Sequence, residues 1–206
     1  MLERFLSKLS TTLYVQIWEN RIKVTDINTG KVFDEKPFLA FETTDKGRDV
    51  IAVGNNSSMV TGSNITIINP FSHPRVLIAD FTIGEKILQH IFQTLHHKKL
   101  IAAAPLVAIH PMEKLEGGLT MIEHRVLLEL ASGAGARDVS VYTGSQLSIH
   151  DFNFEKIKAL EDKAEEGKQT TSPTSLNLVI FLAVLGFGLF ISPIKELLQI
   201  ILSYFN

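Results

Sequence analysis

The chain has 206 residues, of which 45% are hydrophobic and 20% are charged, so it can bury a core of ordinary size. Its formal net charge of -2 argues against a nucleic-acid partner, because phosphate contacts need a surface with clustered Lys and Arg. It contains no cysteine, which excludes disulfides and thiolate metal sites.

The first ten residues have the pattern of a short amphipathic helix. Apolar side chains recur at helical spacing, and charged or polar residues fall between them; the apolar residues are Leu2, Phe5, Leu6 and Leu9. The segment lacks the long apolar region and the cleavage site of a secretory signal. It either contacts a membrane or packs on the following domain, and the pattern leaves both alternatives open.

Residues 13–53 have the alternating pattern of β-strands joined by short turns. Glu19 and Asn20 form the first predicted turn, and residues 28–30 form the second. Further strands are expected at 31–33, 38–41 and 49–53. We therefore predict one meander of strands in this part of the chain.

Residues 54–142 combine helix and strand patterns. We expect a short helix at 57–61, an extended stretch at 65–70, and a strand or the start of a helix at 76–79. Amphipathic helices are predicted at 82–97 and 120–134, with strands at 105–110 and 138–142. Strands that alternate with helices predict parallel pairing and a sheet covered by helices. Residues 11–160 thus form the expected α/β domain.

The last 46 residues change composition. Residues 161–175 are charged and then rich in Thr and Ser, which indicates a solvated linker. Residues 176–191 carry no charge, and as a helix they would span roughly 24 Å, or slightly less than a hydrocarbon core of about 30 Å. We predict a C-terminal membrane anchor at 176–206, with the span at about 176–194 followed by an amphipathic tail; its expected lipid contacts are Phe181, Leu185, Phe187 and Phe190. A buried core helix is the alternative.

Several segments together resemble the first half of MreB, the bacterial actin family. They are residues 50–54 (VIAVG), Gly62 with 67–70, residues 76–90 (VLIADFTIGEKILQH), residues 122–125 (IEHR) and residues 131–139 (ASGAGARDV). The resemblance runs from Met1 to about Tyr142. It implies a single actin-like (ribonuclease H-like) lobe with a mixed sheet flanked by helices, to which the predicted transmembrane helix is added.

The chain departs from this family where the family binds nucleotide. There, two glycine-bearing hairpins hold the phosphates through backbone N–H groups, and the first is similar to residues 13–22. Gln16 stands where the family has an acidic residue for the metal, so no charge neutralises magnesium. Trp18 replaces a glycine, and Glu19 adds a carboxylate, so size and charge oppose a phosphate. We expect no cofactor and no metal.

Glu123 matches the glutamate with which the family polarises the attacking water. It also lies in the first turn of a predicted helix, where the helix dipole favours a carboxylate, so we regard it as vestigial. Residues 143–206 resemble neither the second hairpin nor the adenosine pocket of the family. Residues 112–118 are an insertion relative to the family and are predicted to be a flexible surface loop. His90, His96 and His97 lack a carboxylate at ligand spacing, so they predict no zinc site.

These observations favour a non-catalytic scaffold, tether or regulator of the cell-shape cytoskeleton. The expected location is the cytoplasmic side of the inner membrane, and the expected partners are full-length MreB or other cell-shape proteins, membrane lipid and other copies of the chain. Two alternatives remain: a nucleotide hydrolase completed by a separate second lobe, and a self-assembling structural protein.

Overall fold

The computed structural model describes residues 10–96 and 103–169. The chain divides into one compact unit that ends at Glu161 and a second that begins at Asp162. The predicted leader contacts, the predicted membrane span and its lipid contacts all lie outside the described residues. Within the described ranges, no helix combines the length and the apolar character that a bilayer crossing requires.

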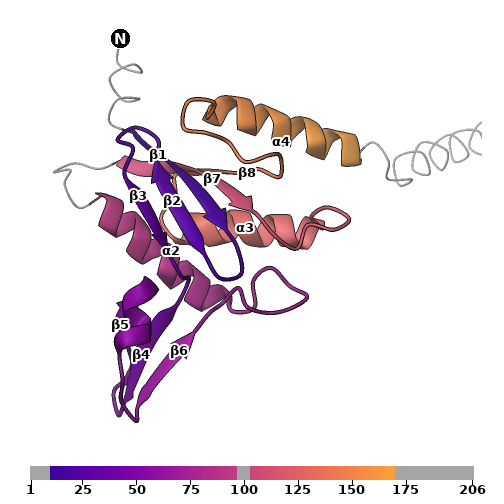
Figure 1. Ribbon diagram of the computed structural model, residues 1–206. Helices are drawn as coiled ribbons and strands as arrows, with labels where there is room; N and C mark the ends of the chain where they lie inside the picture. The colour runs from indigo at the N-terminus through magenta and orange to yellow at the C-terminus, as the bar shows by residue number, and fades with distance from the viewer. Residues whose placement is uncertain (1–9, 97–102, 170–206) are drawn as a thin grey trace, which may run out of the picture. The chain divides into compact units, whose positions relative to one another are not determined.

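A five-stranded mixed sheet forms the centre of the first unit (Figure 1). Its order is β3 (Val32–Glu35), β2 (Ile22–Asp26), β1 (Ser10–Ile17), β7 (Ala103–Pro111) and β8 (Asp138–Val141). The first three strands pair antiparallel, while β1, β7 and β8 run parallel. The predicted parallel pairing and mixed sheet are therefore confirmed.

A separate three-stranded sheet holds the rest of the predicted meander. β4 (Leu39–Thr44) is central and pairs antiparallel with β5 (Gly47–Val53) and β6 (Ile65–Ile68). The prediction of one continuous meander was wrong, because the chain leaves the first sheet after β3. Both sheets nevertheless contribute buried side chains, including Leu13 and Phe41, to one hydrophobic core.

Gly54, which follows β5 in the second sheet, lies close to the end of β3 in the first. Gly54 has φ of +77°, and a Cβ at this position would overlap the Glu35 carboxylate at the end of β3. Its N–H donates to the Phe38 carbonyl at 2.8 Å, and the Asn55 N–H donates to Glu35 Oε2 at 2.8 Å. The short helix predicted at 57–61 is instead the 3₁₀ helix η1 (Gly54–Met59), and residues 76–79 form neither a strand nor a helix.

Two of the helices belong to the main core. α2 (Phe81–His96) and α3 (Met121–Gly133) contribute Ile87, Leu88, Leu127 and Leu130, all of which are fully buried. Gly84 on α2 lets the helices approach, since a Cβ there would lie 3.3 Å from Leu130 Cδ1. Both helices occur where the apolar periodicity predicts them.

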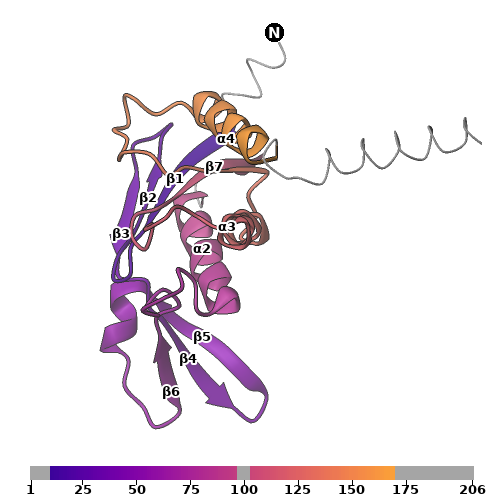
Figure 2. The same cartoon turned by 90° about the vertical axis from the view of Figure 1, so that its right-hand side faces the viewer.

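A third helix, α4 (Phe154–Gln169), begins in the first unit. Phe154 and Ile157 pack with Tyr14 and Ala108 in a second, smaller core. Figure 2 shows α4 beside β1 and β7. Because side chains alternate along a strand, Tyr14 and Leu13 serve different cores. Residues 161–169, at the start of the predicted linker, continue α4, and their described side chains are mostly exposed.

Polar contacts also hold the middle of α4. Glu161 Oε2 accepts the Ser140 hydroxyl at 2.6 Å, and Oε1 accepts the Val141 N–H at 3.0 Å. Oε1 also lies 2.7 Å from His124 Nε2 on α3. Glu161 therefore joins α4 to both β8 and α3.

His110 on β7 is a buried titratable group, with only 1% of its surface exposed. Its Nδ1 lies 2.6 Å from the Tyr14 hydroxyl, and the Tyr14 oxygen accepts the Leu147 N–H at 3.4 Å. Burial disfavours the imidazolium and lowers the pKa of His110 to about 4. The neutral imidazole is thus the form that the folded chain accommodates.

The free energy of unfolding is expected to fall as the pH is lowered from 6.5 to 4. In this window His110 takes up a proton in the unfolded chain but not in the folded chain. The pKa difference corresponds to at most about 3 kcal/mol. His110→Gln keeps an acceptor for Tyr14 but does not titrate, so denaturant unfolding of this variant at several pH values should give a shallower slope. Equal slopes in the two proteins would contradict the assignment.

Candidate functional site at the tip of the β1–β2 hairpin

The β1–β2 hairpin ends in a tight turn. Ile17 pairs with Ile22, and the Trp18 N–H donates to the Arg21 carbonyl at 2.9 Å, which leaves Glu19 and Asn20 as the two-residue loop. The turn predicted at these two residues is therefore confirmed. It lies at the carboxyl ends of the parallel strands β1 and β7, the edge at which open α/β sheets bind ligands.

Gln16 is turned into the protein. It is 1% exposed, and its Nε2 lies 3.8 Å from Met112 Sδ, within reach of a weak hydrogen bond to sulfur. Its Cα is paired with that of His110 in the parallel register. The amide thus lies against the residue that follows β7.

Trp18 is half-buried beside the turn, and Arg21 covers its ring. The guanidinium carbon is 5.0 Å from the ring centroid, which is within cation–π range. Arg21 in turn donates to both carboxylate oxygens of Asp34 on β3, at 2.7 and 2.6 Å. These hydrogen bonds lower the pKa of Asp34 below its usual value. The pair therefore keeps Arg21 over the indole.

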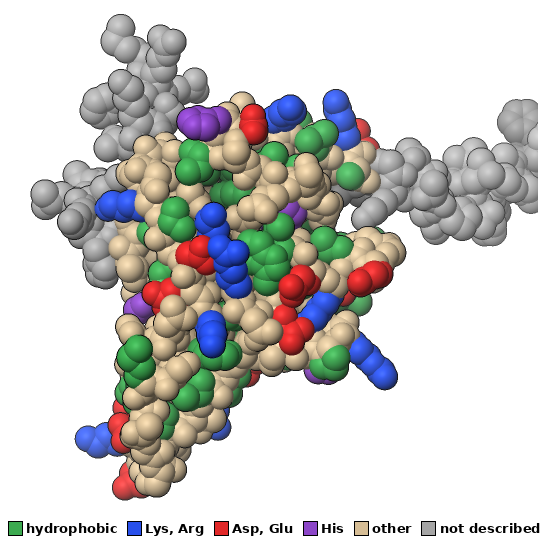
Figure 3. Space-filling view, viewed as in Figure 1, with side chains coloured by type: hydrophobic (Ala, Val, Ile, Leu, Met, Phe, Trp, Pro, Cys, Tyr) green, Lys and Arg blue, Asp and Glu red, His purple; other side chains and the backbone are tan. Residues whose placement is uncertain are grey.

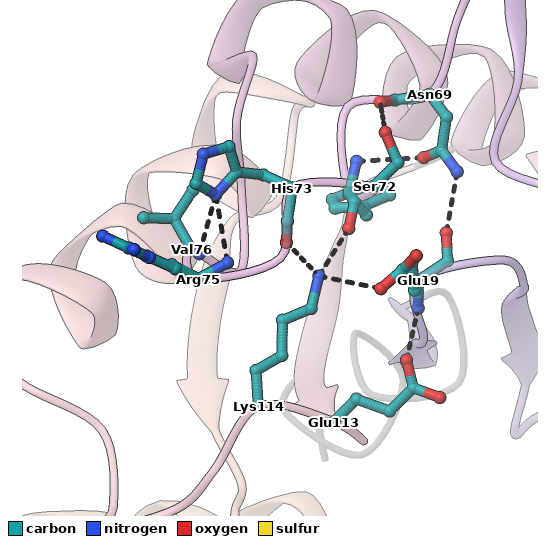
Figure 4. A network of polar contacts seen from close by, with 9 residues as sticks. Glu19, Asn69, Ser72, His73, Arg75, Val76, Glu113 and Lys114 are labelled. Atoms are coloured by element: carbon teal, nitrogen blue, oxygen red, sulfur yellow. Dashed lines mark hydrogen bonds and ion pairs between the residues drawn. The ribbon is translucent and has the colours of Figure 1, made fainter.

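Glu19 is the centre of a polar network (Figure 4). Its N–H donates to Glu113 Oε2 at 2.7 Å, and its carbonyl accepts from Asn69 Nδ2 at 2.8 Å. Its carboxylate Oε2 lies 3.2 Å from Lys114 Nζ. Both backbone groups and the side chain of Glu19 are therefore occupied by other residues of this chain.

Lys114 extends the network to a second segment. Its ammonium donates to the Phe71 carbonyl at 2.9 Å and to the His73 carbonyl at 2.5 Å. Asn69 orders the same segment by accepting the Phe71 N–H at 2.9 Å. Residues 69–73, which follow β6, are thereby joined to the hairpin.

Glu123 has a structural role at the start of α3. Its Oε2 accepts the Thr120 N–H and the Thr120 hydroxyl, both at 2.9 Å, and the Glu123 N–H donates to the Thr120 hydroxyl oxygen at 3.2 Å. This reciprocal pair is a capping box. Its presence agrees with the interpretation of Glu123 as a residue favoured in a first helical turn.

Sequence reasoning missed Glu113, Lys114 and Asn69. The insertion at 112–118 was the available signal, but it predicted only a flexible surface loop. A loop sequence does not reveal which N–H group a carboxylate will reach, because Glu19 and Glu113 are 94 residues apart. Within residues 10–96 and 103–169, no three His, Asp or Glu side chains converge as a metal site would require.

The face seen in Figure 3 carries no broad basic patch. A hydrophobic patch lies near the β1–β2 hairpin, with basic side chains on one side and acidic side chains on the other. Mixed charge of this kind does not form the positive stripe that tracks a phosphate backbone.

Solved structures with a similar fold define the class of protein. Spiroplasma citri MreB5 bound to ADP matches with a TM-score of 0.51 and 22% identity, covering 66% of this chain and 39% of that one. A non-polymerising mutant of MamK bound to AMPPNP matches with a TM-score of 0.52 and 13% identity, covering 65% and 41%. The described lobe therefore has part of an actin-like fold.

Sequence comparison identifies the family. Residues 15–148 match the model of the MreB/Mbl protein family. The cell shape-determining protein MreB of Escherichia coli K12 is 30% identical over 144 residues, which cover 68% of this chain and 40% of the relative. The chain belongs to the MreB/Mbl family and spans about two-fifths of the length of these relatives.

The capping box is expected to stabilise the domain. Thr120→Ala removes both the hydroxyl that caps α3 and one partner of Glu123, so the free energy of unfolding should fall by about 1 kcal/mol. Chemical denaturation measures this change. Arg125→Ala serves as the control, because its exposed pair with Glu129 should contribute little. Equal effects of the two substitutions would contradict the assigned role of Thr120.

Proposed function

We propose that this chain is a non-catalytic, membrane-anchored member of its family that acts by binding. It serves as a scaffold, tether or regulator of an actin-like cytoskeleton on the cytoplasmic side of the inner membrane. The observation that carries this proposal is the hairpin tip, where Trp18 and Glu19 present an indole and a carboxylate. The family resemblance assigns this position to open backbone that faces phosphate.

The contacts of Trp18 hinder its indole from moving away from the position where a phosphate would bind. Arg21 lies over the ring and is held by both oxygens of Asp34, so the indole is confined beside the turn. A phosphate brought to the tip would also meet the carboxylates of Glu19 and Glu113. A like-charge contact at about 4 Å costs roughly 1 to 4 kcal/mol, depending on local screening. At Glu19 the ion pair with Lys114 offsets part of this cost.

The remaining positions that match catalytic residues are also occupied. The Glu123 carboxylate accepts the backbone N–H that caps α3, so binding a water would compete with the cap. The Gln16 amide is buried against Met112 and carries no charge with which to hold a magnesium ion. Both side chains therefore have roles within the fold.

The membrane part of the proposal comes from sequence alone. The uncharged run at 176–191, extended to about 194, has the composition of a short span, and Lys195 can reach the interface at its end. The amphipathic pattern at 1–10 offers a second, weaker contact, and stable anchoring commonly uses two signals. Full-length MreB, or another copy of this chain, is the proposed partner at that surface.

Calorimetry should detect no binding of ATP with magnesium to the full chain in detergent. The expected reason is that the Trp18 indole and the Glu19 carboxylate exclude the phosphates of ATP. The matched variant therefore combines Trp18→Gly with Glu19→Ala, and weak ATP binding is expected only there. Clear heat of binding to the unmodified chain, or ATP hydrolysis that Glu123→Gln abolishes, would favour the hydrolase alternative and overturn this proposal.

Co-purification with MreB from detergent-solubilised cells should succeed for the full chain. A variant that ends at residue 175 tests the anchor. If residues 176–206 are a membrane tether, this variant should leave the membrane fraction, while its lobe should still bind MreB directly. Sedimentation of the same preparations distinguishes self-assembly from an adaptor. Absence of MreB from both preparations, with both variants in the soluble fraction, would contradict the scaffold proposal.

A further inference from the structure

The loop at 112–118 places one anion and one cation at the hairpin tip. Glu113 Oε2 accepts the N–H of Glu19, the first residue of the turn, at 2.7 Å. A carboxylate that accepts a turn N–H forms the same kind of charge-assisted hydrogen bond as a phosphate oxygen in a backbone anion site. The anion at this tip therefore belongs to the chain itself.

The cation occupies a matching set of oxygen atoms. The Lys114 ammonium is surrounded by the Phe71 carbonyl, the His73 carbonyl and the Glu19 carboxylate. Its side chain is only 17% exposed, whereas a lysine on an open surface loop is mostly solvated. The three acceptors together can use all three ammonium donors.

One residue of this loop has an unfavourable backbone conformation that other contacts must stabilise. Lys114 has φ of +61°, in the left-handed region that is unfavourable for a residue with a Cβ. A non-glycine residue persists there when surrounding contacts over-determine it. The two N–H···O contacts and the ion pair of Lys114 are such contacts.

We propose that the 112–118 loop is an internal ligand of the hairpin. Glu113 supplies the anion and Lys114 supplies the cation, so that the hairpin of the five-stranded sheet is fastened, without nucleotide, to residues 69–73, which follow the last strand of the three-stranded sheet. Asn69 completes the fastening through the Glu19 carbonyl. This inference extends the proposed function, because it explains how a lobe that excludes nucleotide keeps its two sheets in a fixed relation.

Hydrogen exchange followed by mass spectrometry tests the internal ligand in the full chain in detergent. Glu113→Ala should speed exchange in peptides covering residues 17–22 by about tenfold, since the Glu19 N–H loses a charge-assisted acceptor. Lys114→Met should speed exchange in peptides covering 69–76. Glu116→Ala, which removes an exposed carboxylate from the same loop, is the matched control and should leave both segments unchanged.

Exchange in β7 and a second substitution at Glu113 distinguish a local change from unfolding. Peptides from β7 should exchange at the unmodified rate in each variant, which separates local release from general unfolding. If Glu113→Ala unfolds the domain, Glu113→Gln retains an uncharged acceptor and should give an intermediate rate. Unchanged exchange at residues 17–22 in both Glu113 variants would overturn the internal ligand.

The calorimetric result with ATP is independent of this outcome. Binding of nucleotide to the unmodified chain would remove the non-catalytic proposal whatever the exchange rates. Unchanged exchange in the Glu113 variants, with nucleotide still excluded, would remove only the internal ligand.

Discussion

The parallel pairing of β1 with β7 is the constraint on which the hairpin site depends. It aligns the carboxyl ends of the two strands, and the Met112 N–H donates to the Ile17 carbonyl at 2.8 Å as β7 ends. The residues that follow β7 must therefore pass beside the hairpin turn. Glu113 and Lys114 reach Glu19 because this pairing leaves them next to it.

The same strands also organise both cores. Alternation along β1 sends Leu13, Val15 and Ile17 toward the main core and Tyr14 toward the smaller one. β1 is therefore buried on both faces, and two of its buried polar side chains have partners. Thr11 has such an interaction, and Gln16 lies against Met112. Displacement of β1 would disturb both cores and the hairpin tip together.

Two polar networks of the lobe are each centred on one charged side chain. At the hairpin tip, Lys114 gathers a carboxylate and two carbonyls from separate segments. Beside β8, Glu161 gathers a hydroxyl, an N–H and an imidazole nitrogen. In each case one charged side chain holds groups from several separate segments. Family membership and an actin-like fold are thus compatible with a tip that this chain fills with its own side chains.

The sequence by itself determined the elements whose pattern is local. The helices at α2 and α3 follow from apolar periodicity, the hairpin turn follows from the alternation on either side of Glu19, and the place of Glu123 in a first helical turn follows from the same periodicity. The similarity of its motifs also indicated the family. The differences from the family at Gln16 and Trp18 were visible in the same comparison.

Only the tertiary structure decided which distant groups meet. The strands predicted as one meander lie in two sheets, and residues 161–169 continue α4, which contacts the rest of the lobe through Phe154, Ile157 and Glu161. The partners of Glu19 lie about 50 and 94 residues away along the chain. Hydrophobic periodicity reports which face of an element is buried, but it does not report which hydrogen-bonding groups the packed elements bring together.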